Sequence, residues 1–281
     1  MTLHEAVAGK ELAPAPEPLP VAVIDAHTHL DACGAETARD VDAAMARAAA
    51  VGVAAAVTVG GDMPSNRWSV SAATGRNDLF AAVAVHPTEA TTLTAAARVE
   101  LERLAADPAV VAIGETGLDF YWDAAPREVQ AEAFAWHIDL AKRAGKPLMI
   151  HDRLAHDQIF GILHAEGAPD TVVFHCFSGD ATMARTCADR GYVMSFAGPV
   201  SFTNAPDLAR AAAVAPLELI MVETDAPFLT PHPHRGRRNE PFALPYTVRA
   251  LARIRQMPFD ELCDAVRINT ERTYGISVIQ P

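Results

Sequence analysis

Cysteine is scarce in this chain, and no long apolar run is present. The four cysteines among 281 residues include no Cys-x-x-Cys pair, which argues against a disulfide framework or a zinc knuckle and favours reduced thiols. The apolar run 48–61 is too short, and its side chains are too small, to span a bilayer. No basic stretch followed by an apolar one begins the chain, so we expect no signal peptide. These absences predict a cytoplasmic protein that does not bind membranes.

Positive charge is also in short supply. The chain has 23 Lys and Arg residues against 35 Asp and Glu residues, which gives a net charge of −12. An acidic surface disfavours nonspecific coating of nucleic acid through bulk basicity. It does not exclude a nuclease in which bound metal ions supply positive charge locally.

The first 20 residues differ from the rest in composition. Residues 13–20 carry proline at every second position, which prevents a helix and disfavours a paired strand. We therefore expect residues 1–20 to form a disordered leader, rich in proline and alanine, outside the fold. Residues 21–281 are long enough for one domain with a large core.

From residue 21 onward, short apolar runs alternate with helical patterns. The clearest helix is 126–144, because Pro126 suits a first turn, Gly145 suits a stop, and apolar residues recur along one face. The expected strands are 21–26, 53–59, 80–85, 109–114, 147–151, 171–175, 191–196 and 218–223. The expected helices are 37–51, 66–75, 92–106, 126–144, 155–166, 180–190, 205–213 and 245–256.

Eight such alternations with continuously apolar strands indicate a parallel sheet. Their number and the chain length predict a (β/α)8 TIM barrel as a single α/β domain. A final helical pair, 258–273, is expected to cap the barrel. An open doubly wound sheet is the alternative, but no Gly-x-Gly-x-x-Gly loop supports it.

Potential metal ligands recur where the expected strands end. His27 and His29 are two residues apart and so face the same side of a strand, a spacing that suits a divalent metal such as zinc or manganese. A single His at a strand end is more often a hydrogen-bonded side chain than a ligand. In a barrel, however, the carboxyl ends of all strands meet at one face. At that face, Glu115, His151, His175 and Asp225 would join His27 and His29 as candidate metal ligands.

Other polar residues allow two interpretations each. Arg153 faces the same way as His151 and would hold a phosphate or else form a salt bridge to Asp152 or Asp119. The aromatic residues 120–122 would stack on a base or cover the barrel rim. The only dense basic cluster, Arg235, Arg237 and Arg238, marks an approach for an anionic strand or a solvated loop. The histidines within expected helices, His137, His156 and His164, are assigned to solvated faces.

These motifs together resemble the TatD family of metal-dependent deoxyribonucleases, from Val21 to about Ile276. The segments that carry the resemblance are 25–29 (DAHTH), 114–119 (GETGLD), 150–153 (IHDR), 175–179 (HCFSG), 223–229 (ETDAPFL) and 235–241 (RGRRNEP). Two positions depart from the family pattern. Thr116 replaces an aliphatic residue, and Asp152 replaces a serine and adds a negative charge near the site.

The resemblance implies a two-metal site and a role for each residue. His27, His29 and Asp225 would hold one divalent ion (Zn, Mn or Mg), His151 and His175 would hold a second, and Glu115 would bridge the two. Asp225 would also act as general base, with Glu115 as the other catalytic carboxylate. Arg153, Arg235 and Asn239 would contact the substrate. Asp25, His86 and Asp119 would support the ligands, although a purely structural role suits Asp25 nearly as well.

The implied activity is hydrolysis of DNA phosphodiesters, from a 3′ end or at a damaged site, with DNA as substrate and no obligate protein partner. Another ester or amide, such as a lactone or an aminoacyl-tRNA ester, is the alternative substrate for the same metal site. A metal-binding interaction protein without turnover is a third possibility, which the complete ligand set disfavours. The scarcity of lysine adds a further discrimination. Lys10, Lys142 and Lys146 all lie away from the expected active face, so no carboxylated lysine bridges metals here, unlike in many amidohydrolases.

Overall fold

The computed structural model describes residues 10–278, which contain eight parallel strands in the order in which they follow along the chain. An isolated bridge between Thr28 and Ala226 joins the last strand region to the first. The expected (β/α)8 barrel is therefore confirmed. The strands are β1 (Val23–Thr28), β2 (Val53–Gly60), β3 (Leu79–Val83), β4 (Val110–Asp119), β5 (Leu148–Arg153), β6 (Val172–Phe174), β7 (Val193–Phe196) and β8 (Ile220–Val222).

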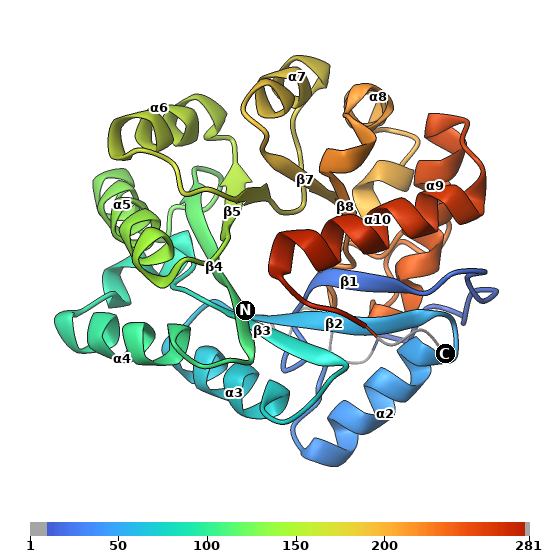
Figure 1. The fold of residues 1–281 in the computed structure, drawn as a ribbon, viewed down its shortest axis with the longest axis horizontal. Helices are drawn as coiled ribbons and strands as arrows, with labels where there is room; N and C mark the ends of the chain where they lie inside the picture. Colours follow the sequence, from blue (N-terminus) through green and yellow to red (C-terminus); the bar gives the residue numbers. More distant parts are fainter. Residues whose placement is uncertain (1–9, 279–281) are drawn as a thin grey trace.

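Helices form a ring around the sheet (Figure 1). They are α2 (Ala38–Ala49), α3 (Met63–Ala73), α4 (Ala95–Ala105), α5 (Arg127–Ala144), α6 (His156–Glu166), α7 (Ala181–Asp189), α8 (Pro206–Val214), α9 (Leu244–Arg255) and α10 (Phe259–Tyr274). Short 3₁₀ turns occupy Pro87–Thr92, Gly198–Ser201, Leu217–Leu219 and Pro241–Ala243. None of the helices in residues 10–278 is long and apolar enough to cross a membrane.

The barrel interior is filled by small and flexible apolar side chains, including Ala55, Ala82 and Met149. The end of α10 and the residues that follow it complete this inner cluster, because Tyr274 and Ile276 belong to it and the Tyr274 hydroxyl donates to the Ala26 carbonyl. The expected helical pair at 258–273 is wrong, since α10 is one continuous helix packed against β1 and β8.

The longest strand, β4, runs five residues beyond its expected end, to Asp119. Gly117 permits this extension, because its φ is +141° and a Cβ there would lie 2.1 Å from the His151 carbonyl oxygen. Only glycine lets β4 and β5 approach so closely at this point. The extension places Glu115 and Asp119 within one strand, beside the end of β5.

The expected leader is corrected for the residues that the structure describes. The part of the expectation that concerns residues 1–9 lies outside the described residues. Residues 10–20 pack on the barrel, since Ala13 and Leu19 are buried and Leu12 forms a parallel bridge with Arg238. The Ala13 N–H donates to the Arg238 carbonyl, and the Leu19 N–H to the Val51 carbonyl. Proline has no backbone N–H, but Ala13 and Leu19 keep theirs. These two N–H groups allow the extended segment 10–20 to bind to the barrel without becoming a strand of the sheet.

Leu19 is the apolar anchor of this arm, with 8% of its surface exposed. Leu19→Ala is expected to lower the free energy of unfolding by about 2 kcal/mol, through lost burial and the cavity left behind. Urea denaturation of the purified protein measures this change. Lys10→Ala, at an exposed position of the same arm, is the control and is expected to change stability by less than about 0.5 kcal/mol. Equal stability of the Leu19 variant and the parent would contradict a docked arm.

Candidate metal centre

The first pair of candidate ligands lies at the end of β1. The rings of His27 and His29 are edge to face, and their Nε2 atoms are 3.2 Å apart. The outer nitrogen of each ring faces a fixed partner: His29 Nδ1 is 2.9 Å from the Val59 carbonyl oxygen, and His27 Nδ1 is 3.2 Å from the Met149 sulfur. An N–H on each outer nitrogen leaves two lone pairs facing each other across the inner gap. That arrangement repels unless a cation lies between the nitrogens.

The second pair shows the same pattern from different strands. His151 Nε2 donates to the Asp119 carboxylate at 3.0 Å, and His175 Nδ1 donates to the Glu223 carboxylate at 3.2 Å. Their inner nitrogens, His151 Nδ1 and His175 Nε2, then carry lone pairs. Both face the Glu115 Oε2 atom, at 3.3 and 2.8 Å. His175 Nε2 is buried and has no hydrogen-bond partner among the described residues.

Glu115 lies between the two pairs. Its Oε1 is 3.3 Å from His29 Nε2 and 3.8 Å from His27 Nε2, whereas its Oε2 faces the other pair. Asp225 completes the first group, with Oδ1 3.6 Å from His27 Nε2 and 3.5 Å from His29 Nε2. Each oxygen of one buried carboxylate thus faces a separate pair of imidazoles.

These separations fit coordination better than direct hydrogen bonding. Ligand atoms at about 2.0–2.1 Å from a tetrahedral metal are roughly 3.3 Å from one another. Donor atoms of His27, His29 and Asp225 form one group within 4.8 Å, and those of Glu115, His151 and His175 form another. Imidazole and carboxylate donors suit divalent transition metals. The residues present therefore fit metal ions.

The electrostatics of the centre also favour a cation. Burial alone would lower the pKa of His29 and of His175, but neighbouring carboxylates raise both pKa values well above the usual range. These carboxylates are Asp225 and Glu115 for His29, and Glu115 and Glu223 for His175. Burial would raise the pKa of Glu115, yet the surrounding imidazoles hold it well below normal. Protons and metal ions thus compete for the same inner nitrogens, so metal affinity falls as pH falls.

Comparison with known proteins identifies the family. Residues 24–275 match the family of TatD related DNases. The chain belongs to the TatD family. It is therefore a metal-dependent hydrolase, as its relatives are named.

Two relatives and one solved structure illustrate the match. A Mycobacterium tuberculosis (strain H37Rv) protein named uncharacterized metal-dependent hydrolase TatD is 56% identical over 259 residues, which cover 90% of this chain and 98% of that protein. A Klebsiella pneumoniae protein named 3′-5′ ssDNA/RNA exonuclease TatD is 31% identical over 247 residues, which cover 85% and 94%. The crystal structure of YJJV, a TatD homolog from Escherichia coli K12, has a TM-score of 0.85 and 28% identity, with 91% and 98% covered.

One buried carboxylate of this TatD-family site has no role predicted from the sequence. Glu223 is fully buried, and its Oε1 accepts from His175 Nδ1 and, at 2.7 Å, from the Cys176 N–H. It therefore fixes the His175 ring with the inner nitrogen toward Glu115. A signal was available in the sequence, since Glu223 precedes Asp225 by two residues at the same strand end.

Glu223→Gln is expected to weaken metal binding about tenfold, because the amide keeps the shape but removes the charge that makes His175 a stronger ligand. Isothermal titration with Mn²⁺ or Zn²⁺ measures the change. Glu132→Gln, at an exposed position on α5, is the matched control. Unaltered affinity in the Glu223 variant would show that His175 needs no charged partner.

Asp25 supports the site through hydrogen bonds to Thr224, and not as the partner of an imidazole ring. Its Oδ1 accepts the Thr224 N–H at 2.8 Å and its Oδ2 accepts the Thr224 hydroxyl at 2.5 Å. Burial raises the pKa of Asp25 to about 8, against the lowering effect of those hydrogen bonds. Asp25 thus ties β1 to the turn that carries Asp225, which is the structural role that the sequence left open. It contacts no imidazole ring among the described residues.

Asn239 is corrected from substrate contact to scaffold. It is fully buried, and its Nδ2 donates to the Thr224 carbonyl at 2.9 Å and to the Phe228 carbonyl at 2.7 Å. A buried amide bonded to two carbonyls holds the turn around Asp225 and does not reach a substrate.

His86 faces the centre with its protonated nitrogen, whereas the four candidate ligands face it with a lone pair. Its Nδ1 accepts the Thr88 N–H, which leaves the proton on Nε2, 3.9 Å from the Glu115 Oε2. Burial, followed by the neighbouring His151, lowers the pKa of His86 to about 3. The ring therefore offers a neutral N–H donor to the site. Asp119, expected to support the ligands, bonds to His151 as described above.

The basic cluster after β8 is largely neutralised. Arg237 pairs with Glu11 at 3.0 Å and donates to the Leu12 carbonyl, and Arg238 pairs with the buried carboxylate of Glu240 at 3.1 Å. Arg235 has no acidic partner among the described residues, and it stacks over the Phe202 ring at 4.1 Å. The solvated or structural interpretation therefore applies to two of the three arginines.

Near β5, the additional negative charge of Asp152 is compensated. Its side chain is 4% exposed and forms an ion pair with His156 at 2.6 Å. Within residues 10–278, Arg153 forms no salt bridge to Asp152 or Asp119, so neither carboxylate neutralises its positive charge. The assignment of His156 to a solvated face is replaced by this partly buried pair.

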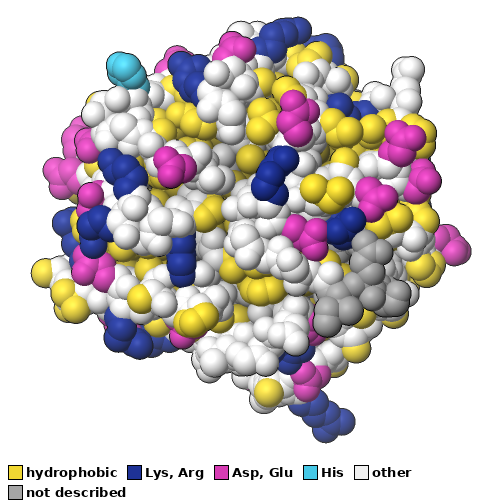
Figure 2. All heavy atoms as spheres, viewed as in Figure 1, with side chains coloured by type: hydrophobic (Ala, Val, Ile, Leu, Met, Phe, Trp, Pro, Cys, Tyr) yellow, Lys and Arg dark blue, Asp and Glu magenta, His cyan; other side chains and the backbone are white. Residues whose placement is uncertain are grey.

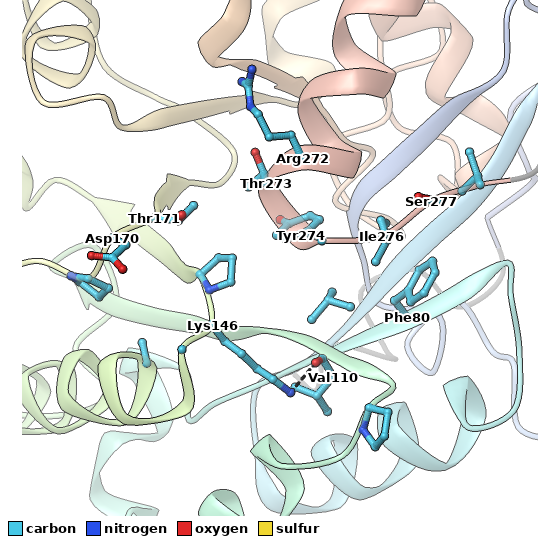
Figure 3. A pocket seen from close by; sticks show the side chains of 18 of the residues that line it. Phe80, Val110, Lys146, Asp170, Thr171, Arg272, Thr273, Tyr274, Ile276 and Ser277 are labelled. Carbon is cyan, nitrogen blue, oxygen red and sulfur yellow. Dashed lines mark hydrogen bonds between the residues drawn. The ribbon is translucent and has the colours of Figure 1, made fainter.

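A cavity lies at the other end of the barrel. It has a volume of about 1120 Å³ and is lined by strand beginnings and the end of α10, including Phe80, Lys146 and Arg272 (Figure 3). Lys146 donates to three backbone carbonyls there, one of them that of Val110 at 2.6 Å. Figure 2 shows basic and acidic side chains interspersed on one face of the molecule, without a continuous basic track there. None of the candidate metal ligands lines this cavity.

His137 was assigned to a solvated face, but it is fully buried. Its Nδ1 donates to the Ala133 carbonyl at 2.7 Å, and its Nε2 accepts the Val85 N–H at 3.1 Å. This ring fixes the backbone directly before His86. Burial lowers its pKa to about 4, despite the hydrogen bond to Ala133.

The lowered pKa of His137 predicts a loss of stability in acid. Between about pH 6.5 and pH 4 the unfolded chain binds a proton that the folded chain refuses, so stability falls as pH falls, by about 3 kcal/mol from this group. His137→Gln is expected to flatten that part of the profile in urea denaturation series. His164→Gln, an exposed histidine on α6, is the control and should leave the profile as it is. Parallel profiles for the parent and the His137 variant would contradict the assignment.

Proposed function

We propose that this TatD-family protein is a two-metal phosphodiesterase that acts on nucleic acid, with DNA as its principal substrate. One observation carries the metal count: the two oxygens of Glu115 face two separate pairs of imidazoles, each with its inner lone pairs turned toward the carboxylate. His27, His29 and Asp225 would hold one ion, His151 and His175 the other, and Glu115 both. Two divalent ions at such a site neutralise a phosphate oxygen and supply hydroxide at neutral pH.

Asp225 is the best-placed general base. Its backbone is left-handed, with φ of +51°, a conformation that Asp tolerates better than most residues. The Asp225 N–H donates to the His27 carbonyl, which fixes the turn, and the carboxylate is 13% exposed. This carboxylate can therefore both face the two histidines of β1 and accept the proton of an attacking water.

His86 supplies the complementary donor. As a neutral ring with its proton on Nε2, it can donate a hydrogen bond to a phosphate oxygen without bringing a charge that would repel the metals. Arg153, whose guanidinium has no acidic partner among the described residues, can hold a phosphate oxygen beside His151.

The substrate class is supported by family membership and by relatives. The Klebsiella pneumoniae relative is named an exonuclease of single-stranded DNA and RNA. The test is metal-dependent digestion of end-labelled single- and double-stranded DNA, with and without EDTA, followed by identification of the product ends. Stepwise loss of nucleotides from the 3′ end supports exonuclease action, and cleavage only at abasic positions supports damage-site endonuclease action. Turnover of a lactone or an aminoacyl-tRNA with no cleavage of DNA would overturn the proposal.

Glu115→Gln tests the shared carboxylate. The substitution keeps the size but removes the negative charge that both ions share, so the metal content is expected to fall from about two ions per chain and kcat on DNA by at least 100-fold. Inductively coupled plasma analysis and the digestion assay measure the two effects. Glu132→Gln is the control, and circular dichroism checks that the fold is kept. Near-parental activity with full metal content would exclude a bridging role for Glu115.

A further inference from the structure

Two aromatic side chains are exposed beside the metal centre, directly after β4. Tyr121 is 55% exposed and Trp122 is 56% exposed, with their rings edge to face and 4.9 Å apart. The other tryptophans, Trp68 and Trp136, are only partly exposed and pack against the core. Large aromatic rings held in water are costly, so a ligand that covers them is the natural explanation.

The pair is fixed to the site by hydrogen bonds. Asp119 Oδ1 accepts the N–H groups of Tyr121 and Trp122, at 2.9 and 3.0 Å. The other oxygen of the same carboxylate accepts from His151 Nε2 at 3.0 Å. Gln130, which is buried on α5, bonds to both the N–H and the carbonyl of Asp119. Asp119 therefore connects the turn that carries Tyr121 and Trp122 to the candidate ligand His151. Asp119 and Gln130 hold this turn in position, and the aromatic side chains themselves are not needed for it.

A positively charged side chain lies beside the two aromatic rings. The Arg153 guanidinium lies 4.0 Å from the centre of the Tyr121 ring and 5.7 Å from that of Trp122. The Phe120 N–H donates to the Arg153 carbonyl, which holds the end of β5 against the turn. Exposed aromatic faces beside an arginine match the two parts of a nucleotide, because bases stack on rings and phosphates pair with guanidinium.

We propose that Tyr121, Trp122 and Arg153 form a stacking platform for unpaired bases, which selects single-stranded nucleic acid for the metal centre. The proposal rests on the function proposed above. In a duplex the faces of internal bases are covered by their neighbours, so only an unpaired nucleotide can present a base to the rings. Stacking is tolerant of base identity and of sugar, so the platform favours single strands without reading sequence.

The test compares strands with and without bases on the metal-loaded protein. A phosphorothioate-linked thymidine decamer, which resists cleavage, carries a fluorescent label at its 5′ end and is titrated with the protein by fluorescence anisotropy, and an equally labelled decamer of abasic residues is its matched partner. Stacking of one base on an aromatic ring corresponds to roughly a 5- to 150-fold change in affinity. We expect the parent to bind the thymidine strand tighter by a factor in that range. We expect the Tyr121→Ala, Trp122→Ala double variant to bind both strands with affinities within about twofold.

Three further measurements make the result specific. Tyr121→Phe with Trp122→Phe is expected to restore the preference for bases, because the rings return. Ile268→Ala, at a half-exposed apolar position on α10, is the control for lost apolar surface and should keep the parental ratio. In digestion assays, the preference for single strands over blunt duplex should collapse in the double alanine variant through a higher KM for the single strand.

Equal binding of the two strands by the parent, or an unchanged ratio in the double alanine variant, would overturn the platform. So would a parent dimer that the double variant converts to a monomer, because the rings would then be covered by a second copy. Cleavage of DNA with an unchanged ratio would reject the platform alone. Failure of the parent to cleave or bind any strand would reject the proposed function as well.

Discussion

The metal centre depends on the partner of the outer nitrogen in each histidine ring. The outer nitrogens of His27, His29, His151 and His175 face a sulfur, a backbone carbonyl and two carboxylates, respectively. Each partner fixes which nitrogen carries the proton, and so fixes where the free lone pair points. If all four rings were neutral, their converging lone pairs would repel one another and the carboxylate between them. The raised pKa values of His29 and His175 reflect this demand for positive charge. A divalent cation would meet it by coordination and would allow the barrel to bury these polar groups together.

The barrel makes this arrangement rigid because the outer partners come from strands next to, or across from, the strand that carries the ring. Asp119 on β4 holds His151 on β5, Glu223 after β8 holds His175 after β6, and Val59 on β2 holds His29 after β1. Asp25 and Asn239 then fix the turn around Asp225 from two sides. A change in any strand register would turn several rings at once, so fold stability and ligand geometry are coupled.

The proposed function requires an acidic protein to bind a polyanion. Two arginines of the cluster after β8 are paired with Glu11 and Glu240, and the docked arm forms hydrogen bonds with the backbone of Arg238. Arg153, next to the exposed rings, and Arg235 form no ion pair with an acid among the described residues. Under the proposed function, Arg153 and the metal ions would bind the phosphates, and a broad basic surface is not required.

The sequence by itself determined the barrel and the set of candidate ligands. Apolar periodicity predicts each strand and helix from local residues, and parallel strands must end at one face, so ligand types at strand ends predict a common site without any distances. The limits of β4 were missed because only the contact of Gly117 with β5 makes its extension possible.

Only the tertiary structure decided what each polar group contacts. His137 has the same local pattern as a solvated helix residue, yet it is buried against β3. Arg237 and Arg238 read as free charges until the arm and Glu240 are placed beside them. The proline-rich segment 10–20 reads as disordered because several of its partners, such as Arg237 and Arg238, lie more than 200 residues away in the chain. Apart from Glu240, which is two residues from Arg238, the deciding partners are distant in sequence, and contacts of that kind leave no periodic pattern in the segment itself.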